Sequence, residues 1–142
     1  MIVAIFGPFF VPAQAAAQQD HDQMITVFRQ WANAMARKDF RNWEKASASY
    51  RYATTYNLVV SRKDEWPDAI FALPFRVPEI GSLDHLATLQ NGPTANIIYY
   101  GRIDFGILED DVPKNIFMLR FVKEDTGWKF DNTRFFNIAG NE

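Results

Sequence analysis

The alternation of apolar and polar residues between positions 94 and 138 constrains the fold most strongly. One side of the first stretch, residues 94–108, is apolar: Ala95, Ile97, Tyr99, Ile103, Phe105 and Ile107. The alternation returns in residues 115–123, where Phe117, Leu119 and Phe121 share a side, and in residues 128–138. A period of two with one apolar side is typical of a half-buried strand. The sequence therefore predicts three consecutive antiparallel strands.

The turn between the last two strands sets their expected register. Residues 124–127 read Glu-Asp-Thr-Gly, and the glycine can adopt the positive φ that such a turn needs. A four-residue loop predicts the pairs Lys123–Trp128, Phe121–Phe130, Leu119–Asn132 and Phe117–Arg134, with Arg120 facing Asp131. The opposite charges of the last pair favour this register, since a one-residue slip would invert every side chain.

This register places two polar side chains, Asn132 and Arg134, on the core face beside Trp128. Tyr99 lies on the core face of its own strand. Polar groups that converge in an apolar concavity are typical of small-molecule sites. We therefore expect these four residues to line a site for a small apolar ligand. The alternative is that Arg134 lies near the strand end and extends into solvent.

The opposite face of the sheet is too apolar for a surface left in water. Its expected interface residues are Ile98, Tyr100, Arg102, Met118, Arg120 and Phe135. A two-fold axis would bring this patch against its own copy, with the charged residues fixing the register. The sequence predicts a homodimer through this face. The alternative is a monomer whose long charged side chains shield the apolar ones.

The N-terminal segment, residues 1–17, is typical of a secretory signal peptide. An uncharged apolar run from Ile2 to Val11 precedes Ala13-Gln14-Ala15, a small-x-small cleavage pattern, although no Lys or Arg comes before the run. The run is too short to span a membrane, so no membrane insertion is expected after cleavage. The alternative is a disordered apolar tail. We expect a single mature domain over residues 18–142, periplasmic or secreted and without a lipid anchor, because there is no cysteine.

The residues before the strands predict helices. Asp20 and Gln23 form a capping box, and Met24, Phe28 and Trp31 follow at helical spacing. Asp39 can cap a second helix from Phe40 to about residue 60, although residues 51–60 also suit a strand. Trp66-Pro67-Asp68 begins a short third helix, and residues 83–90 form an edge strand. The fold class is α+β, with N-terminal helices packed on a curved four-strand antiparallel meander.

Composition argues against several classes of function. A net charge of −2 gives no reason to expect a nucleic-acid partner. The absence of cysteine excludes thiol catalysis and thiolate zinc sites. Glu109-Asp110-Asp111 lacks the spacing of a calcium loop and is interpreted as a solvated loop. No cofactor and no metal are expected.

The order of elements resembles the nuclear transport factor 2-like superfamily, a cystatin-like group of α+β cones that includes ketosteroid isomerase and the polyketide cyclases. The resemblance covers about residues 22–138. It rests on that order, on the Phe28-to-Trp31 helix followed by Asp39, and on the hairpin Gly127-Trp128-Lys129-Phe130-Asp131. It implies a conical pocket, and in ketosteroid isomerase an Asp base with a Tyr and a protonated Asp as donors.

None of these three roles can be placed on the expected interior, because Asp104 and Asp131 fall on the outer face. The favoured function is therefore that of an exported, non-catalytic domain that dimerises, binds a small apolar ligand in the cone, or does both. The alternative is a small isomerase- or hydrolase-like enzyme with His85 or Asp104 as its general base. No residue is assigned a catalytic role beyond that alternative.

Overall fold

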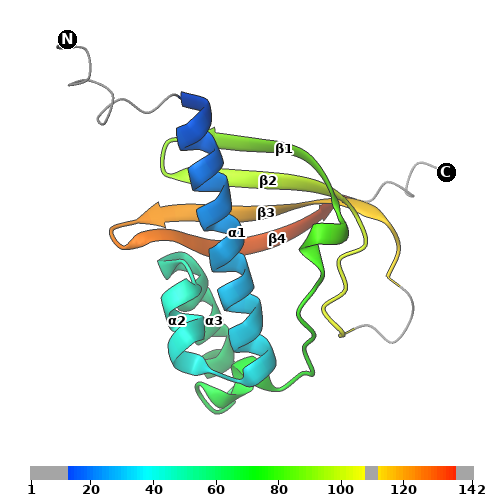
Figure 1. The fold of residues 1–142 in the computed structure, drawn as a ribbon. Coiled ribbons are helices and arrows are strands. Elements are labelled where there is room, and N and C mark those ends of the chain that lie inside the picture. The colour runs from blue at the N-terminus through cyan, green and yellow to red at the C-terminus, as the bar shows by residue number, and fades with distance from the viewer. Residues whose placement is uncertain (1–12, 108–111, 137–142) are drawn as a thin grey trace, which may run out of the picture.

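The protein folds as three helices packed against a four-strand antiparallel sheet (Figure 1). The structure is a computed structural model, and it describes residues 13–107 and 112–136. The elements are α1 (Ala13–Arg37), α2 (Phe40–Ala46), α3 (Ser49–Ser61), the short 3-10 helices η3 (Asp68–Phe71) and η4 (Ile80–Ser82), β1 (Asp84–Asn91), β2 (Thr94–Gly101), β3 (Asn115–Glu124) and β4 (Gly127–Phe136). The predicted α+β class is confirmed.

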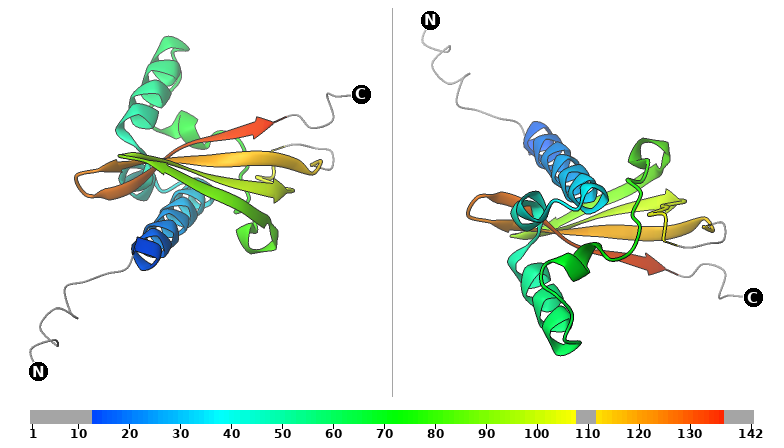
Figure 2. Two further views of the ribbon diagram at one scale, coloured as in Figure 1. Left: turned by 90° about the horizontal axis from the view of Figure 1, so that it is seen from above. Right: turned by 90° about the horizontal axis from the view of Figure 1, so that it is seen from below.

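Helix α1 covers one face of the sheet, called here the inner face. Met24, Phe28 and Trp31 recur at helical spacing and are buried, so this stripe builds the core as predicted. The Phe28 and Trp31 rings both contact the ring of Phe130 on β4, with centroids 5.0 and 4.7 Å apart. Figure 2 shows α3 projecting on the opposite side of the sheet from α1. The outer face is therefore bounded by α3 at one edge.

The predicted second helix is interrupted. Asp39 caps α2 as expected, since its Oδ1 accepts a hydrogen bond from the Asn42 backbone N–H at 3.2 Å. At Ser47 and Ala48 the chain becomes extended, and the Ala48 N–H donates to the carbonyl of Phe130 at 2.8 Å. This bond to strand β4 replaces a helical one, which is why α3 starts anew at Ser49. The helical interpretation of residues 51–60 is confirmed.

The four strands pair in the order β1-β2-β3-β4, as a meander. The pairs Lys123–Trp128 and Phe121–Phe130 are those predicted. Beyond them the register shifts by one residue, because Arg120 pairs with Asn132 and leaves Asp131 as a bulge. The predicted pairs Leu119–Asn132 and Phe117–Arg134 are therefore wrong, and Leu119 faces Thr133 while Phe117 faces Phe135.

Strand β2 is shorter than the alternation suggested. It ends at Gly101, whose φ of 148° favours glycine; an added Cβ would lie 2.7 Å from Leu83 Cδ2 and would force the end of that side chain to move. Residues 102–107 leave the sheet, yet Ile103 stays buried and the Phe105 carbonyl accepts a hydrogen bond from the Arg76 N–H at 2.7 Å. Of the remaining apolar positions, Phe105 is half-buried and Ile107 is exposed, so the alternation of burial ends soon after the strand pairing does.

The N-terminal predictions fall at the limit of the described chain. Residues 1–12 lie outside it, and α1 already begins at Ala13, within the predicted cleavage pattern. The Glu109–Asp111 segment, predicted as a solvated loop, also lies outside the described residues, as do positions 137–142. None of the described helices is both long enough and apolar enough to cross a bilayer.

Candidate functional site

The outer face of the sheet carries apolar side chains that α1 does not reach. Ile98 on β2 pairs with Met118 on β3, and Tyr100 pairs with Ile116 one step along. All four are half-buried, whereas their inner-face neighbours Ile97 and Leu119 are fully buried. A cross-strand apolar patch of this kind, open on one side, is a candidate interaction surface.

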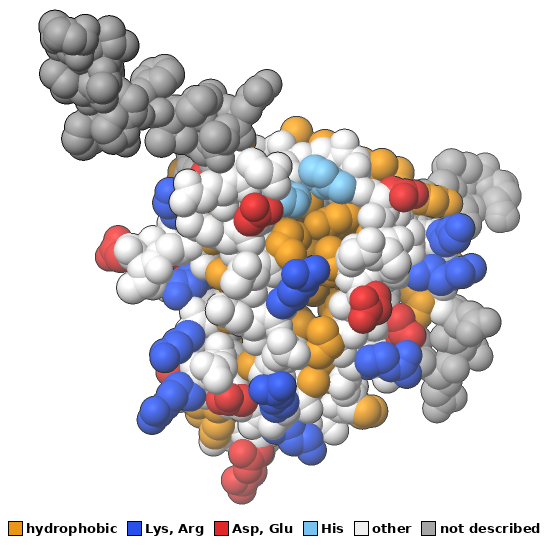
Figure 3. Space-filling view, viewed as in Figure 1, with side chains coloured by type: hydrophobic (Ala, Val, Ile, Leu, Met, Phe, Trp, Pro, Cys, Tyr) orange, Lys and Arg blue, Asp and Glu red, His pale blue; other side chains and the backbone are white. Residues whose placement is uncertain are grey.

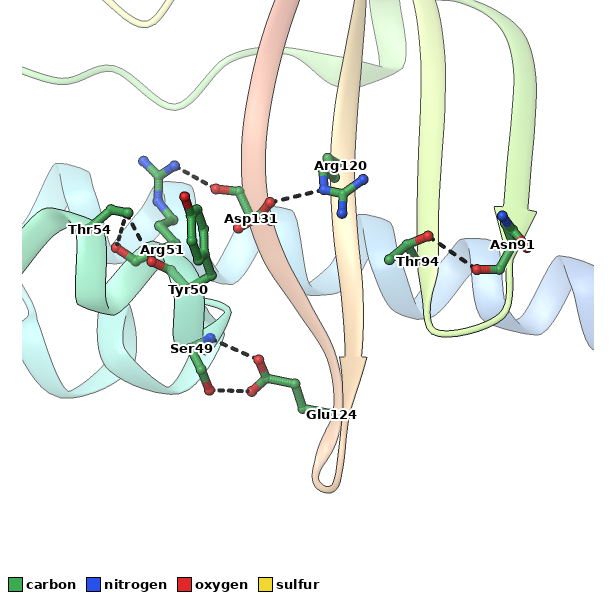
Figure 4. Close-up of polar contacts among 9 residues, drawn as sticks. All are labelled: Ser49, Tyr50, Arg51, Thr54, Asn91, Thr94, Arg120, Glu124 and Asp131. Atoms are coloured by element: carbon green, nitrogen blue, oxygen red, sulfur yellow. Dashed lines mark hydrogen bonds and ion pairs between the residues drawn. The ribbon is translucent and has the colours of Figure 1, made fainter.

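Charged residues border this patch. Arg120 Nε donates to Asp131 Oδ2 at 3.1 Å, the opposite-charge contact that the sequence predicted. The backbone carbonyl of Asp131 accepts a second hydrogen bond from Arg51 Nη1 at 2.7 Å (Figure 4). The bulge at Asp131 therefore joins the outer face, through its carboxylate, to helix α3, through its carbonyl.

A second polar contact anchors α3 to the sheet. The Glu124 carboxylate accepts hydrogen bonds from the Ser49 backbone N–H at 2.8 Å and from the Ser49 hydroxyl at 3.1 Å (Figure 4). A carboxylate at the first turn of a helix satisfies an otherwise unpaired N–H and suits the helix dipole. Two contacts therefore hold helix α3 beside the sheet, one with Glu124 at the end of β3 and one with Asp131 on β4.

The structure gathers four of the six expected interface residues on the outer face: Ile98, Tyr100, Met118 and Arg120. Arg102 lies beyond the end of β2 and is exposed. The expected outward position of Phe135 is wrong, because the bulge turns it to the inner side, where its ring lies 5.9 Å from that of Phe117.

The expected ligand-binding residues do not converge. Tyr99 and Trp128 lie on the inner face and are each 3% exposed. Asn132 and Arg134 are exposed on the outer face, opposite Arg120 and Met118, which corrects their predicted inward direction. The physical reason is again the extra residue at Asp131, since one added position inverts every side chain that follows.

An apolar cavity of about 360 Å³ does exist, but elsewhere. It lies where the chain leaves β2 and returns to β3, and its walls include Ile103, Phe105, Ile107, Val112 and Phe135. None of the four expected ligand-binding residues lines it. Its volume is at the lower end of the range of small-molecule sites. The sequence signal for it was the apolar odd positions continuing past the end of the strand.

The two candidate bases differ in their surroundings. Asp104 Oδ2 forms an ion pair with Arg76 Nη1 at 2.9 Å, and Oδ1 accepts from the Gly106 N–H at 2.7 Å, so this carboxylate holds its own loop. His85 Nε2 lies 2.8 Å from the hydroxyl oxygen of Thr88. The same hydroxyl lies 3.1 Å from His21 Nδ1, on α1.

The two histidines of the chain, His21 and His85, therefore lie close together, although 64 positions (85 − 21) separate them in the sequence. Their ring centroids are 4.8 Å apart, and Figure 3 shows them at the rim of an apolar area. A shift of register between His85 and Ala87 places His85 and Thr88 on the same face, toward α1. Sequence reasoning missed this cluster because it depends on that bulge and on the angle of α1.

Burial shifts the pKa of two groups at this position, His21 and Tyr99. Burial lowers the pKa of His21 from its ordinary value, and the neighbouring His85 lowers it further, while Asp22 acts in the opposite direction. Burial also raises the pKa of Tyr99, beside His85, to about 12, against the opposing charge of Arg29. One hydroxyl between two imidazoles suits a pair in which His21 is neutral. Among residues 13–107 and 112–136, no three His, Cys, Asp or Glu side chains gather as metal ligands would.

Comparison with known proteins yields one structural likeness. No protein-family model and no curated protein matches the chain. A solved structure that does match is the solution structure of a SEC-C motif-containing protein from Rhodopseudomonas palustris, with a TM-score of 0.44 and 15% identity over 84% of this chain and 91% of that one. At that level the likeness carries no functional inference.

These findings overturn the assignment to the nuclear transport factor 2-like superfamily, because the matching structure is that of a SEC-C motif-containing protein. The element order that suggested the superfamily, helices before a meander, is a general α+β arrangement. The hairpin from Gly127 to Asp131 is likewise a common turn solution rather than a family signature.

Proposed function

We propose that this domain is a non-catalytic binding module that self-associates through the outer face of its sheet. The observation that supports it is the pair of half-buried apolar contacts, Ile98–Met118 and Tyr100–Ile116, on the side of the sheet opposite α1. Apolar area of this kind gains free energy when a partner removes it from water. A second copy would present the same patch about a two-fold axis.

The charged residues at the border of the patch favour one defined partner over non-specific association. Arg120 and Asp131 give neighbouring positive and negative positions, and Arg134 adds an exposed cation opposite Met118. Two copies in the correct register can pair these charges, whereas a shifted register brings like charges together. An apolar centre with a polar border is the usual anatomy of a protein interface.

Sedimentation velocity at micromolar concentrations tests the proposal. We expect the wild type to sediment as a dimer and Met118→Glu to sediment as a folded monomer, because a carboxylate at the centre of the patch cannot be desolvated cheaply. Asn33→Glu is the matched control, since it adds the same charge at an exposed position of α1. A monomeric wild type, or equal effects of the two variants, would refute self-association through this face.

A small apolar ligand remains a second candidate function, now in the 360 Å³ cavity beside Ile103 and Phe135. The supporting observation is the predominance of hydrocarbon in its walls. Titration with toluene, followed through the methyl NMR signals of Ile103 and Ile107, should give saturable shifts. Ile107→Trp should fill the cavity and abolish them, and unchanged wild-type signals would exclude this site.

The enzymatic alternative now favours His85 over Asp104. His85 has a hydroxyl within hydrogen-bond reach, at 2.8 Å, as a base next to a nucleophile would. Asp104 is already engaged by Arg76 and Gly106. If hydrolysis of activated esters such as p-nitrophenyl acetate occurs, His85→Gln should abolish it and Asp104→Asn should not. Equal rates for the wild type and His85→Gln would exclude this base.

We further propose that the protein is exported and that residues up to about Ala15 or Ala17 are removed. The support is the apolar run and cleavage pattern of the sequence. Cleavage there would remove the first turn of α1 and leave its buried stripe, which starts at Met24, intact. Mass spectrometry of the protein from its own host should find the shortened form outside the cytoplasm. A mature form that keeps Met1 would contradict export.

A further inference from the structure

Arg51 is a cation in an apolar setting, and no carboxylate of residues 13–107 and 112–136 forms an ion pair with it. Its guanidinium carbon lies 4.7 Å from the Trp31 ring centroid and 5.3 Å from that of Phe130. Nη1 donates to the backbone carbonyl of Asp131, while the Asp131 carboxylate is bound to Arg120 instead. Burial lowers the pKa of Arg51 to about 10, against the raising effect of Asp131. The charge is therefore only partly compensated.

A small cavity of about 220 Å³ adjoins this arginine, between the helices and η3. Its apolar walls include Met35, Val59 and Ile70, and its polar lining includes Arg51, Thr55, Arg62 and Asp64. Two arginines against one carboxylate leave the lining with a net positive charge. The cavity thus combines hydrocarbon on one side with cationic donors on the other.

Two buried donors of this lining have no hydrogen-bond partner in the described part of the chain: Arg51 Nε and Trp43 Nε1. Each is an N–H group with no acceptor role, so an oxygen with free lone pairs would satisfy it. Both nitrogen atoms are fully buried, so a ligand oxygen reaches them only when the Arg51 and Trp43 side chains shift. Arginine binds planar carboxylates in a fork of parallel hydrogen bonds, and such charge-assisted bonds are the strong ones. The unpaired N–H donors and the net positive charge of the lining therefore both favour a carboxylate.

We propose that this cavity binds a short-chain organic acid, with its carboxylate toward Arg51 and Arg62 and its hydrocarbon chain against Val59 and Ile70. Asp64 in the lining disfavours ligands with a second negative charge, such as hydrogen phosphate. The apolar walls favour a carboxylate with a carbon chain over a strongly hydrated inorganic anion. None of the cavity residues belongs to the outer face, so this proposal stands or fails independently of self-association.

Titration of the full chain at neutral pH with butyrate tests the proposal. Trp43 lines the cavity, so its fluorescence should change with saturation, together with the methyl NMR signals of Val59 and Ile70. Butan-1-ol has the same carbon chain without the charge, and inorganic phosphate has charge without the chain. Both should fail to produce saturable shifts at these residues.

Variants separate the cavity from general attraction of anions. Arg62→Gln should weaken butyrate binding roughly tenfold, as loss of one charged hydrogen bond does. Arg41→Gln makes the same change at an exposed position of α2 and should leave affinity unchanged. Arg51→Gln should abolish binding, and Arg62→Gln keeps the test valid if that variant fails to fold.

Three results would overturn the inference. The first is no saturable shift with butyrate, which means that water alone meets the two donors. The second is equal binding of butyrate and phosphate, which means simple charge attraction. The third is equal affinity of the Arg62→Gln and Arg41→Gln variants, which places the acid outside this cavity.

Discussion

The two faces of strand β3 show how one alternating sequence is used in two ways. Phe117, Leu119 and Phe121 are each 0% exposed beneath α1. Their neighbours Ile116 and Met118 have comparable hydrophobicity but remain half-buried, because no helix packs over them in the described residues. Hydrophobicity alone therefore does not determine which face becomes the core. The position of α1 does, and it leaves the side chains of the other face partly exposed.

The largest expected effect comes from shortening large side chains on each face of the sheet in turn. Trp31→Ala and Phe121→Ala should each reduce the free energy of unfolding by about 3–5 kcal/mol, as large-to-small core changes do. Met118→Ala, measured in dilute protein, should cost less than about 1 kcal/mol, because the residue is half-exposed there. Urea denaturation gives both values. Similar decreases in the free energy of unfolding for Phe121→Ala and Met118→Ala would contradict the distinction between the two faces.

The ion pair on the outer face gives a smaller effect. A double-mutant cycle with Arg120→Met and Asp131→Asn should give a coupling free energy of about 0.2–1 kcal/mol, the range of exposed or cross-strand pairs. Arg120 is 41% exposed, which limits the gain. High salt should reduce the coupling. A coupling that salt leaves unchanged would mean that the contact acts through the shape of the bulge and not through charge.

His21, at the rim of the inner face, should make stability depend weakly on pH. The pKa of His21 is lowered from 6.5 in the folded state, so the unfolded chain binds more protons as the pH falls through that value. Stability should therefore decrease on acidification below about pH 6.5. His21→Gln should flatten this part of the profile in thermal melts. Stability that rises on acidification through the same range would contradict the sign.

Local patterns predicted those parts of the fold that depend on near neighbours. The stripe of α1, the cap at Asp39 and the pair Phe121–Phe130 each follow from a few adjacent residues. The turn at Gly127 sets the register of only the nearest pairs. These elements were therefore readable from periodicity and turn chemistry.

The candidate sites were less predictable because they depend on irregularities of the backbone. The bulge at Asp131 exchanged the directions expected for Arg134 and Phe135, and nothing in the alternation marks an extra residue there. The meeting of His21 with His85 needs a second bulge and a distant helix. The 360 Å³ cavity likewise forms where the chain leaves β2.

The methionine methyl groups provide the most direct test of the central claim, that the outer face is an association surface and the inner face is a core. Met24 is 0% exposed beneath the inner face, and Met118 lies at the middle of the outer patch. With methyl-labelled methionine, raising the protein concentration from micromolar to millimolar should shift the Met118 signal and protect it from a soluble paramagnetic probe. The Met24 signal should stay unchanged and protected throughout. A Met118 methyl that remains open to the probe at every concentration would contradict the account.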